Sequence, residues 1–321
     1  MNTGTTKYVS NILNTVGATP GSTYGNTTEA RWIQFKIPIS QFENKIGPIS
    51  DFRSIRFMRM FMTGFESDIT VRFGSLEFVR GDWLRYKLSL DPNESNDQDA
   101  LDTTAFDQEA LNVYEDSNRT PIPYVMPPGV YREQVYVNNT VIDENEQSLS
   151  LTVAGTGLEA GDSRAVFKNV SIDMRQYKNI NMFMHAESLP AGKGEELKDS
   201  EMAGFVRFGN DLSENFYQIE LPLEVTQPGA ITSDEIWPSV NNIQVSMDLL
   251  TQAKLKLISS GTILGPGEIY YITAKELDPT STSKLRIGVR GNPNFGLIRN
   301  LLLGVKNNTT YREVDGADLI P

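Results

Sequence analysis

Cysteine is absent from this sequence of 321 residues, and histidine occurs once, as His185. Without cysteine the chain has no disulfides, no thiolate metal ligands and no thiol nucleophile. A single histidine also argues against multi-histidine zinc sites and against most catalytic designs that use histidine as a base. Any chemistry would therefore depend on carboxylates, hydroxyls, amines or one imidazole.

Long apolar runs are absent too, since no uninterrupted stretch approaches the ~20 residues of a membrane-spanning helix. The first residues, Met1-Asn-Thr-Gly-Thr-Thr, lack the basic and apolar regions of a secretory leader. Positive charge is in the minority, with 29 Lys and Arg against 41 Asp and Glu, a net charge of -12. Because a phosphate backbone would repel this chain and no basic stripe compensates, we expect a soluble, acidic protein with no nucleic-acid partner.

Apolar and polar residues alternate with the period of a β-strand along much of the chain. After a loosely organised lead-in over residues 1–30, the alternation of Ile33, Phe35, Ile37 and Ile39 predicts a strand with one buried face. Residues 55–62 are apolar on both sides except for arginines, which predicts a central sandwich strand. A third strand begins at residue 69, and the slip in its alternation after Gly74 predicts a β-bulge.

Nine Asp or Glu residues and no Lys or Arg lie between Asp91 and Asp116, and a Pro-rich stretch follows over residues 121–129. Such a self-repelling run is typical of a solvated linker or long loop, and the prolines stiffen it. We therefore predict a linker over residues 91–128 that separates two domains.

Short alternating segments resume in residues 129–321. One of them alternates Tyr217, Ile219 and Leu221 with Gln218 and Glu220. One helix interrupts the strands, because apolar residues then recur every three or four positions. These are Val240, Ile243, Met247, Leu250, Ala253 and Leu257. They predict a helix over about 240–258 that is capped by Ser239 and ended by Gly261.

A short pattern, an aromatic residue followed three positions later by isoleucine and an apolar strand, occurs three times. The pairs are Phe52 and Ile55, Tyr177 and Ile180, and Phe295 and Ile298. Chance recurrence of strand composition is one explanation, and a repeated half-sandwich is the one we favour. We predict an all-β fold of tandem jelly-roll-like sandwich units. The first, residues 1–90, is a half or truncated domain, and the second, residues 129–321, contains the one amphipathic helix.

Oxygen-bearing side chains in residues 91–102 follow the spacing of a calcium-binding loop. They are Asp91, Asn93, Ser95, Asp97, Asp99 and Asp102. Against calcium, Asn96 replaces the usual glycine, and Asp102 replaces the usual bidentate glutamate. We favour a solvated loop, with calcium binding as the alternative, and expect no other metal or cofactor.

His185 precedes Glu187 by two residues, so a histidine–carboxylate pair is conceivable. No nucleophile motif of the G-x-S-x-G kind accompanies it, and a structural role is commoner. The glycine-rich stretch over residues 261–267 lacks the Gly-Lys-Ser/Thr of a phosphate loop and predicts a turn. We therefore expect no catalytic residue and no enzymatic activity.

Five aromatic residues could form a sugar-stacking platform on a sandwich. They are Trp32, Trp83, Tyr124, Tyr131 and Trp237. Most have flanking residues that favour packing in the core or at a sheet edge. A carbohydrate-binding module is therefore the alternative function, and it predicts an exposed aromatic row.

Several stretches resemble one family, in order and at compatible spacing over most of residues 30–305. They are 31–38, 51–65, 76–83, 173–178, 181–187, 206–210, 215–220, 288–292 and 295–305. Through them the chain resembles the SprA (Sov) family of very large outer-membrane translocon proteins. These proteins belong to the type 9 secretion system and to gliding motility in Bacteroidetes.

This resemblance implies that the chain is a non-enzymatic, soluble part of a giant β-barrel translocon that exports folded proteins. The barrel strands would lie elsewhere in a far longer protein. The implied location is the periplasmic or extracellular side of the outer membrane. The implied partners are the rest of the barrel, other type 9 secretion components and exported cargo.

Overall fold

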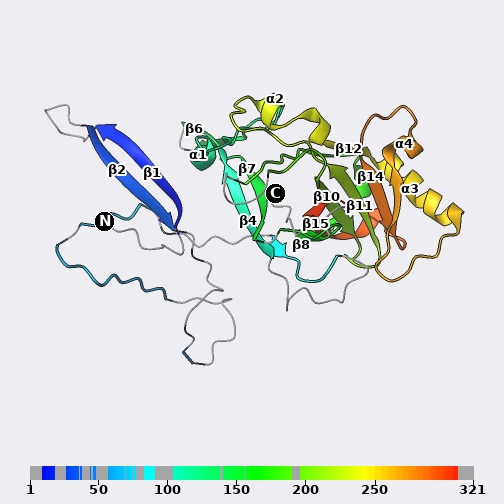
Figure 1. The fold of residues 1–321 in the computed structure, drawn as a ribbon, viewed down its shortest axis with the longest axis horizontal. Helices are drawn as coiled ribbons and strands as arrows, with labels where there is room; N and C mark the ends of the chain where they lie inside the picture. Colours follow the sequence, from blue (N-terminus) through cyan, green and yellow to red (C-terminus); the bar gives the residue numbers. More distant parts are fainter. Residues whose placement is uncertain are drawn as a thin grey trace. The chain divides into compact units, whose positions relative to one another are not determined.

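A computed structural model describes residues 9–18, 27–35, 83–90, 104–137, 140–155, 157–189 and 196–309, together with residues 37, 44, 46, 47, 57–68, 70–74 and 76. The chain divides into two compact units, residues 1–76 and residues 77–321, which Figure 1 colours from blue to red along the sequence. Within the described ranges, no helix has the length and apolar character needed to span a membrane.

The first unit contains an antiparallel hairpin, in which β1 (Val9–Ala18) pairs with β2 (Thr27–Phe35). The predicted strand from residue 33 is thus confirmed as far as Phe35, but its predicted buried face is wrong, because Ile33 and Phe35 are 44% and 55% exposed. The predicted loose lead-in is wrong over β1. Residues 57–62 and 70–74 form no strand, and no bulge occurs at Gly74. Their large side chains are exposed, with Phe57 at 93%. These two predictions fail because a sandwich strand needs paired neighbours on both sides, and the described part of this unit supplies none here.

The second unit is built on a seven-stranded antiparallel sheet in the order β13–β14–β11–β10–β15–β8–β3. Its strands are β3 (Leu84–Arg85), β8 (Ser163–Ile172), β10 (Met202–Gly209), β11 (Phe216–Pro222), β13 (Tyr270–Thr273), β14 (Arg286–Arg290) and β15 (Ile298–Asn307). β3 pairs with β8 and so lies in the second unit, which begins at residue 77. The sequence-based prediction places residues 84 and 85 in a first domain over residues 1–90.

Further elements pack on one face of this sheet. Two ladders, β4 (Thr104–Asn112) with β7 (Gln147–Gly155) and β9 (Asn179–Met182) with β12 (Ile243–Ser246), share a core with it, as does α3 (Met247–Ser260). A further hairpin consists of β5 (Gln134–Val137) and β6 (Thr140–Asp143). The short turns are α1 (Val113–Asp116), η1 (Met174–Gln176), α2 (Ser233–Ile236), η2 (Ser239–Asn241), α4 (Ala274–Leu277) and η3 (Phe295–Leu297).

Strand β10 shows why both faces of the sheet are buried. Val206 and Phe208 point into the main core, whereas Phe205 joins Ala165 and Leu302 in a second cluster on the opposite face. The ring of Phe205 lies over Gly304 of the neighbouring strand β15. A Cβ atom added to Gly304 would come within 2.3 Å of the phenyl Cζ. The missing side chain of Gly304 thus makes room for an aromatic ring on the neighbouring strand.

The helix begins later than its apolar spacing predicts. Ile243 and Val245 are buried and Gln244 is exposed, so residues 243–246 follow the period of two and form β12. Ser246, and not Ser239, caps α3 by accepting a hydrogen bond from Leu249 N at 3.2 Å. The predicted end is confirmed, because Gly261 adopts the left-handed conformation with φ of 64°.

The predicted linker is wrong over residues 104–128, while residues 91–103 lie outside the described residues. Residues 104–112 form β4, in which Phe106 enters the core while Asp107 and Glu109 remain exposed. Ile122 and Tyr124 of the Pro-rich stretch are buried against Ile236 and Trp237. The acidic run includes the solvent face of a strand here, and charge density alone does not distinguish that from a loop.

Two occurrences of the repeated pattern have equivalent structures: η1 leads into β9 with Ile180, and η3 leads into β15 with Ile298. The first occurrence, at residues 52–56, lies outside the described residues. The predicted all-β class is confirmed, since antiparallel sheets dominate the second unit. The jelly-roll connection of the strands stays a prediction.

Candidate functional site

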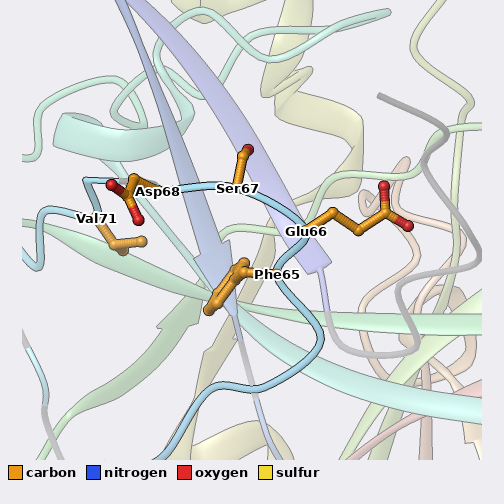
Figure 2. Close-up of a pocket in the computed structure, with 5 residues that line it drawn as sticks. All are labelled: Phe65, Glu66, Ser67, Asp68 and Val71. Atoms are coloured by element: carbon orange, nitrogen blue, oxygen red, sulfur yellow. The ribbon is translucent and has the colours of Figure 1, made fainter.

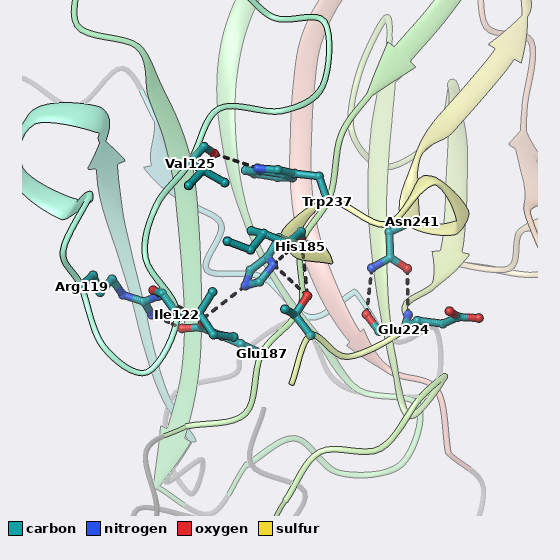
Figure 3. Close-up of polar contacts among 10 residues, drawn as sticks. Arg119, Ile122, Val125, His185, Glu187, Glu224, Trp237 and Asn241 are labelled. Carbon is teal, nitrogen blue, oxygen red and sulfur yellow. Dashed lines mark hydrogen bonds and ion pairs between the residues drawn. The ribbon is translucent and has the colours of Figure 1, made fainter. Parts of the chain in front are cut away.

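The only histidine lies where four segments of the second unit meet. We call this group the His185 junction, and Figure 3 shows most of it. It consists of Arg119, His185, Glu187, Thr226, Ile236 and Trp237. Arg119 belongs to the segment after α1, which we call the arm, residues 117–130. His185 and Glu187 follow β9, Thr226 follows β11, and Ile236 ends α2.

Both ring nitrogens of His185 face oxygen atoms. Nδ1 lies 2.7 Å from the carbonyl oxygen of Ile236 and 3.2 Å from Thr226 Oγ1, and Nε2 lies 3.2 Å from Glu187 Oε2. Because a carbonyl can only accept, Nδ1 carries the proton and donates it to Ile236. In the neutral ring Nε2 therefore has no proton, and its contact with Glu187 is not a hydrogen bond. Burial lowers the pKa of His185, the hydrogen bond to Ile236 opposes that effect, and the charge of Arg119 adds to it. The ring is therefore neutral at neutral pH.

Arg119 joins the arm to this ring through Glu187. Its Nη1 donates to Glu187 Oε2 at 3.0 Å and to the carbonyl of Ile122 at 2.9 Å, and its Nη2 pairs with the other carboxylate oxygen. Such a two-point contact fixes the orientation of both groups. Burial lowers the pKa of Arg119, and the charges of Asp116 and Glu109 partly offset this.

Trp237 closes the junction on its other side. The indole Nε1 donates to the carbonyl of Val125 at 2.8 Å, and the ring meets His185 and Tyr124 edge-on, with centroids 5.8 and 6.3 Å away. The Tyr124 hydroxyl donates to Glu146 Oε2 at 2.5 Å. Burial and the bond to Glu146 raise the pKa of this phenol well above its usual value. Arg119, Tyr124 and Val125 of the arm are thus each hydrogen-bonded to another segment.

The side-chain amide of Asn241 forms two hydrogen bonds with the backbone of a neighbouring loop, as the backbone of a paired β-strand would. Its side chain accepts from Glu224 N and donates to Glu224 O, each at 2.8 Å, and the residue is fully buried (Figure 3). The amide therefore satisfies one backbone donor and one backbone acceptor after the end of β11.

The residue types at the junction, a hydroxyl, an imidazole and a carboxylate, are those of a catalytic triad. The predicted pair of His185 and Glu187 is indeed in contact. However, Thr226 is 5% exposed, and its Oγ1 also points to the Ile236 carbonyl at 3.4 Å. A substrate would have to displace packed residues to reach that oxygen, so the geometry favours a structural role.

A second polar cluster lies on the opposite face of the sheet, and sequence reasoning missed it. Glu220 is fully buried and accepts hydrogen bonds from Arg286 Nε at 2.6 Å, from Gln218 Nε2 at 2.5 Å and from the Tyr271 hydroxyl. Tyr271 reaches it across β14 at Gly288, where an added Cβ would come within 2.8 Å of the ring. Gln218 in turn accepts from Arg207 Nε at 2.6 Å.

Charge balance keeps this Glu220 cluster ionised. Burial opposes the charge on Glu220, but Lys306 and Arg286, with hydrogen bonds from Tyr271 and Gln218, hold its pKa below the usual range. Burial lowers the pKa of Arg207 to about 10, and this guanidinium also lies 4.0 Å from the Phe216 ring. The sequence shows Gln218 and Glu220 as polar residues of one strand, but it does not show that strands on both sides bury them.

The other predicted sites have different outcomes. The calcium candidates, residues 91–102, lie outside the described residues, and elsewhere in the described chain no three His, Asp or Glu side chains cluster for a metal. Tyr124 and Trp237 are buried together, Trp83 packs on the core, and Tyr131 is exposed. The five aromatic residues therefore form no single exposed row. Residues 261–267 form the helix end and a turn, as predicted.

The first unit has a shallow hollow lined by Phe65, Glu66, Ser67, Asp68 and Val71. Figure 2 shows the carboxylates of Glu66 and Asp68 pointing to opposite sides. One short stretch of chain supplies all five residues, and no set of polar groups converges on a common point. The hollow is therefore a surface feature and has no arrangement for catalysis.

A comparison with known families adds one finding. A family model described as motility related/secretion protein matches residues 9–318, which include most of both units. No curated protein matches the chain.

Proposed function

This chain belongs to the SprA_N family of motility related/secretion proteins, and from that premise we propose that it is a non-enzymatic part of an outer-membrane translocon. The translocon would export folded proteins in the type 9 secretion system and support gliding motility. The match over residues 9–318 is the observation that carries the proposal.

The way in which the second unit uses its polar side chains supports a scaffold role. The His185 junction holds the arm against β9, β11 and α2, and the Glu220 cluster connects four strands of the sheet. Buried charges arranged in this way fix the relative positions of elements, because removing one partner leaves the other uncompensated. A segment of a large channel has to keep its shape while cargo moves past it.

The partners that fit this role are the rest of the translocon, other components of the secretion system and exported cargo. The net charge of -12 suits a surface along which folded cargo passes without sticking. The proposed location is the outer membrane, on its periplasmic or extracellular side.

Replacement of the chromosomal sequence by variants tests the proposal. Trp237→Ala removes an aromatic anchor of the arm and is expected to lower both cargo secretion and gliding. His185→Gln with Glu187→Gln keeps similar volumes but removes any acid–base pair, and is expected to leave secretion in place if the protein folds. Loss of secretion in this second variant at unchanged folding would favour catalysis and contradict the proposal.

A further inference from the structure

One four-residue sequence occurs twice in the chain, once in each unit. Val71-Arg72-Phe73-Gly74 is identical to Val206-Arg207-Phe208-Gly209. Each copy follows one of the isoleucines of the repeated pattern, Ile55 or Ile180. In the second unit this sequence is the C-terminal half of β10. The first unit therefore repeats part of the sequence of β10.

The two copies differ in what covers them. Val206 and Phe208 are 4% and 2% exposed, because β10 is paired on both sides and its inner face packs into the main core. Val71 and Phe73 are 43% and 62% exposed and belong to no strand. The same apolar side chains are thus buried in one unit and exposed in the other.

The described part of the first unit covers only one end of the motif. Gly74 lies against the indole of Trp32 on β2, where an added Cβ would come within 3.4 Å of the ring. Val71 and Phe65, in contrast, line the open hollow of Figure 2. Exposed apolar side chains gathered in this way mark an interaction surface.

The second unit shows which kind of element completes such a surface. β15 pairs antiparallel with β10 and sets Leu303 opposite Val206 and Leu301 opposite Phe208. We propose that residues 70–74 bind a β-strand of a partner polypeptide, with apolar residues at alternating positions as in β15. By the register of β15, those residues would lie opposite Val71 and Phe73.

A membrane surface fits the observations less well than a strand. Arg72 stands between the two apolar residues, and Arg56 and Arg59 precede them, so an extended chain carries arginine on both faces. Charge within the hydrocarbon region of a membrane is unfavourable, whereas interface centres in proteins are enriched in aromatic residues, Met and Arg.

The charges of the two units indicate the kind of partner. Residues 1–76 carry eight Lys or Arg and five Asp or Glu, whereas residues 77–321 carry 21 Lys or Arg and 36 Asp or Glu. The net charges of +3 and -15 favour an acidic protein partner. This proposal depends on the repeat and not on the secretion role.

A synthetic peptide with the sequence of residues 298–307, in which glutamate replaces Arg299 and Lys306 so that its charge matches the proposed acidic partner, serves as the probe. It is added to the full 321-residue chain, and hydrogen–deuterium exchange is followed by mass spectrometry. We expect amides 70–74 to exchange at least about tenfold more slowly with the peptide, which corresponds to a pairing free energy of about 1.4 kcal/mol. Amides 206–209 are paired already and are expected to be unchanged.

Two variants and one control peptide make the result specific. Val71→Asp is expected to abolish the protection, whereas Thr63→Asp, a change at another exposed residue that does not line the hollow, keeps it. A peptide with proline in place of Leu303 cannot continue the ladder and is expected to give no protection.

Four results would overturn the proposal. They are unchanged exchange with the peptide, equal protection by the proline peptide, protection already present in the free chain, and protection by phosphatidylglycerol vesicles but not by the peptide. Protection in the free chain would mean that another part of this chain covers the motif.

Discussion

At the scale of single residues, two tyrosines on neighbouring parts of the sheet show how burial and hydrogen bonding combine. Tyr217 is fully buried and stacks on Phe295 at 4.8 Å, and its hydroxyl has no hydrogen-bond partner among the described residues. Tyr271, on the other face, donates to Glu220. A buried hydroxyl without a partner is unfavourable, whereas one that binds a carboxylate is favourable.

Tyr217→Phe and Tyr271→Phe form a matched pair. We expect Tyr217→Phe to leave the free energy of unfolding unchanged or raised by about 1 kcal/mol, since it removes only an unsatisfied group. Tyr271→Phe is expected to lower it by about 1–3 kcal/mol, since Glu220 loses a buried donor. Urea unfolding of both variants measures the difference, and equal effects would contradict this account of the two hydroxyls.

Gly304 offers a second test at this scale. Gly304→Ala places a methyl group against the Phe205 ring, and we expect a loss of about 1–3 kcal/mol of stability from overpacking. Phe205→Leu in the same chain removes the clashing ring atoms and should recover part of that loss. If the double variant is no more stable than Gly304→Ala alone, the contact is not the cause.

At the scale of elements, the N-cap residue determines where α3 begins, whereas the spacing of apolar residues does not. Ser246→Ala removes the side chain that accepts from Leu249 N, and we expect a loss of about 1 kcal/mol. Ser239→Ala is the control, because Ser239 is exposed and only opens η2. Thermal unfolding of the two variants tells them apart, and a larger loss at Ser239 would contradict the observed boundary.

The packing of the arm on the His185 junction is expected to depend on pH. Folding lowers the pKa of His185 below its ordinary value of 6.5, so near that pH the folded chain binds fewer protons than the unfolded chain. The stability that depends on neutral His185 is therefore complete above about pH 6.5 and is lost as the pH falls through the lowered pKa. The groups that face the ring are Glu187, Arg119 and Thr226.

We expect wild-type stability to fall between pH 7 and pH 5 more steeply than that of His185→Gln. Urea unfolding at several pH values measures the slopes. The signal of the single imidazole in an NMR titration gives the direction of the pKa independently. A pKa above 6.5, or equal slopes in the two proteins, would show that the ring is not held neutral by burial.

At the scale of the whole molecule, the period-two alternation predicted the all-β class and many strands of the second unit, because burial of one face leaves a signal in each strand. It did not predict the Glu220 cluster. In the sequence Gln218 and Glu220 have the pattern of a solvent-exposed strand face, and only the pairing of β11 with β10 and β14 shows that they are buried. The prediction of a linker at the arm is wrong for a similar reason. Only Ile236 and Trp237, more than 100 residues away, make Ile122 and Tyr124 core residues. Residues 57–62 show the reverse case, in which a strongly apolar stretch is left exposed.

We propose that this chain contributes to secretion as a folded scaffold and not through chemistry at one site, and one comparison tests this most directly. Secreted cargo is measured in cells that carry single variants of the His185 junction, the Glu220 cluster and the main core. The free energy of unfolding of the same variants is measured on purified protein. We predict that secretion follows stability along one common curve, whichever group is changed. A variant at His185, Glu187 or Glu220 with native stability and no secretion would contradict the claim.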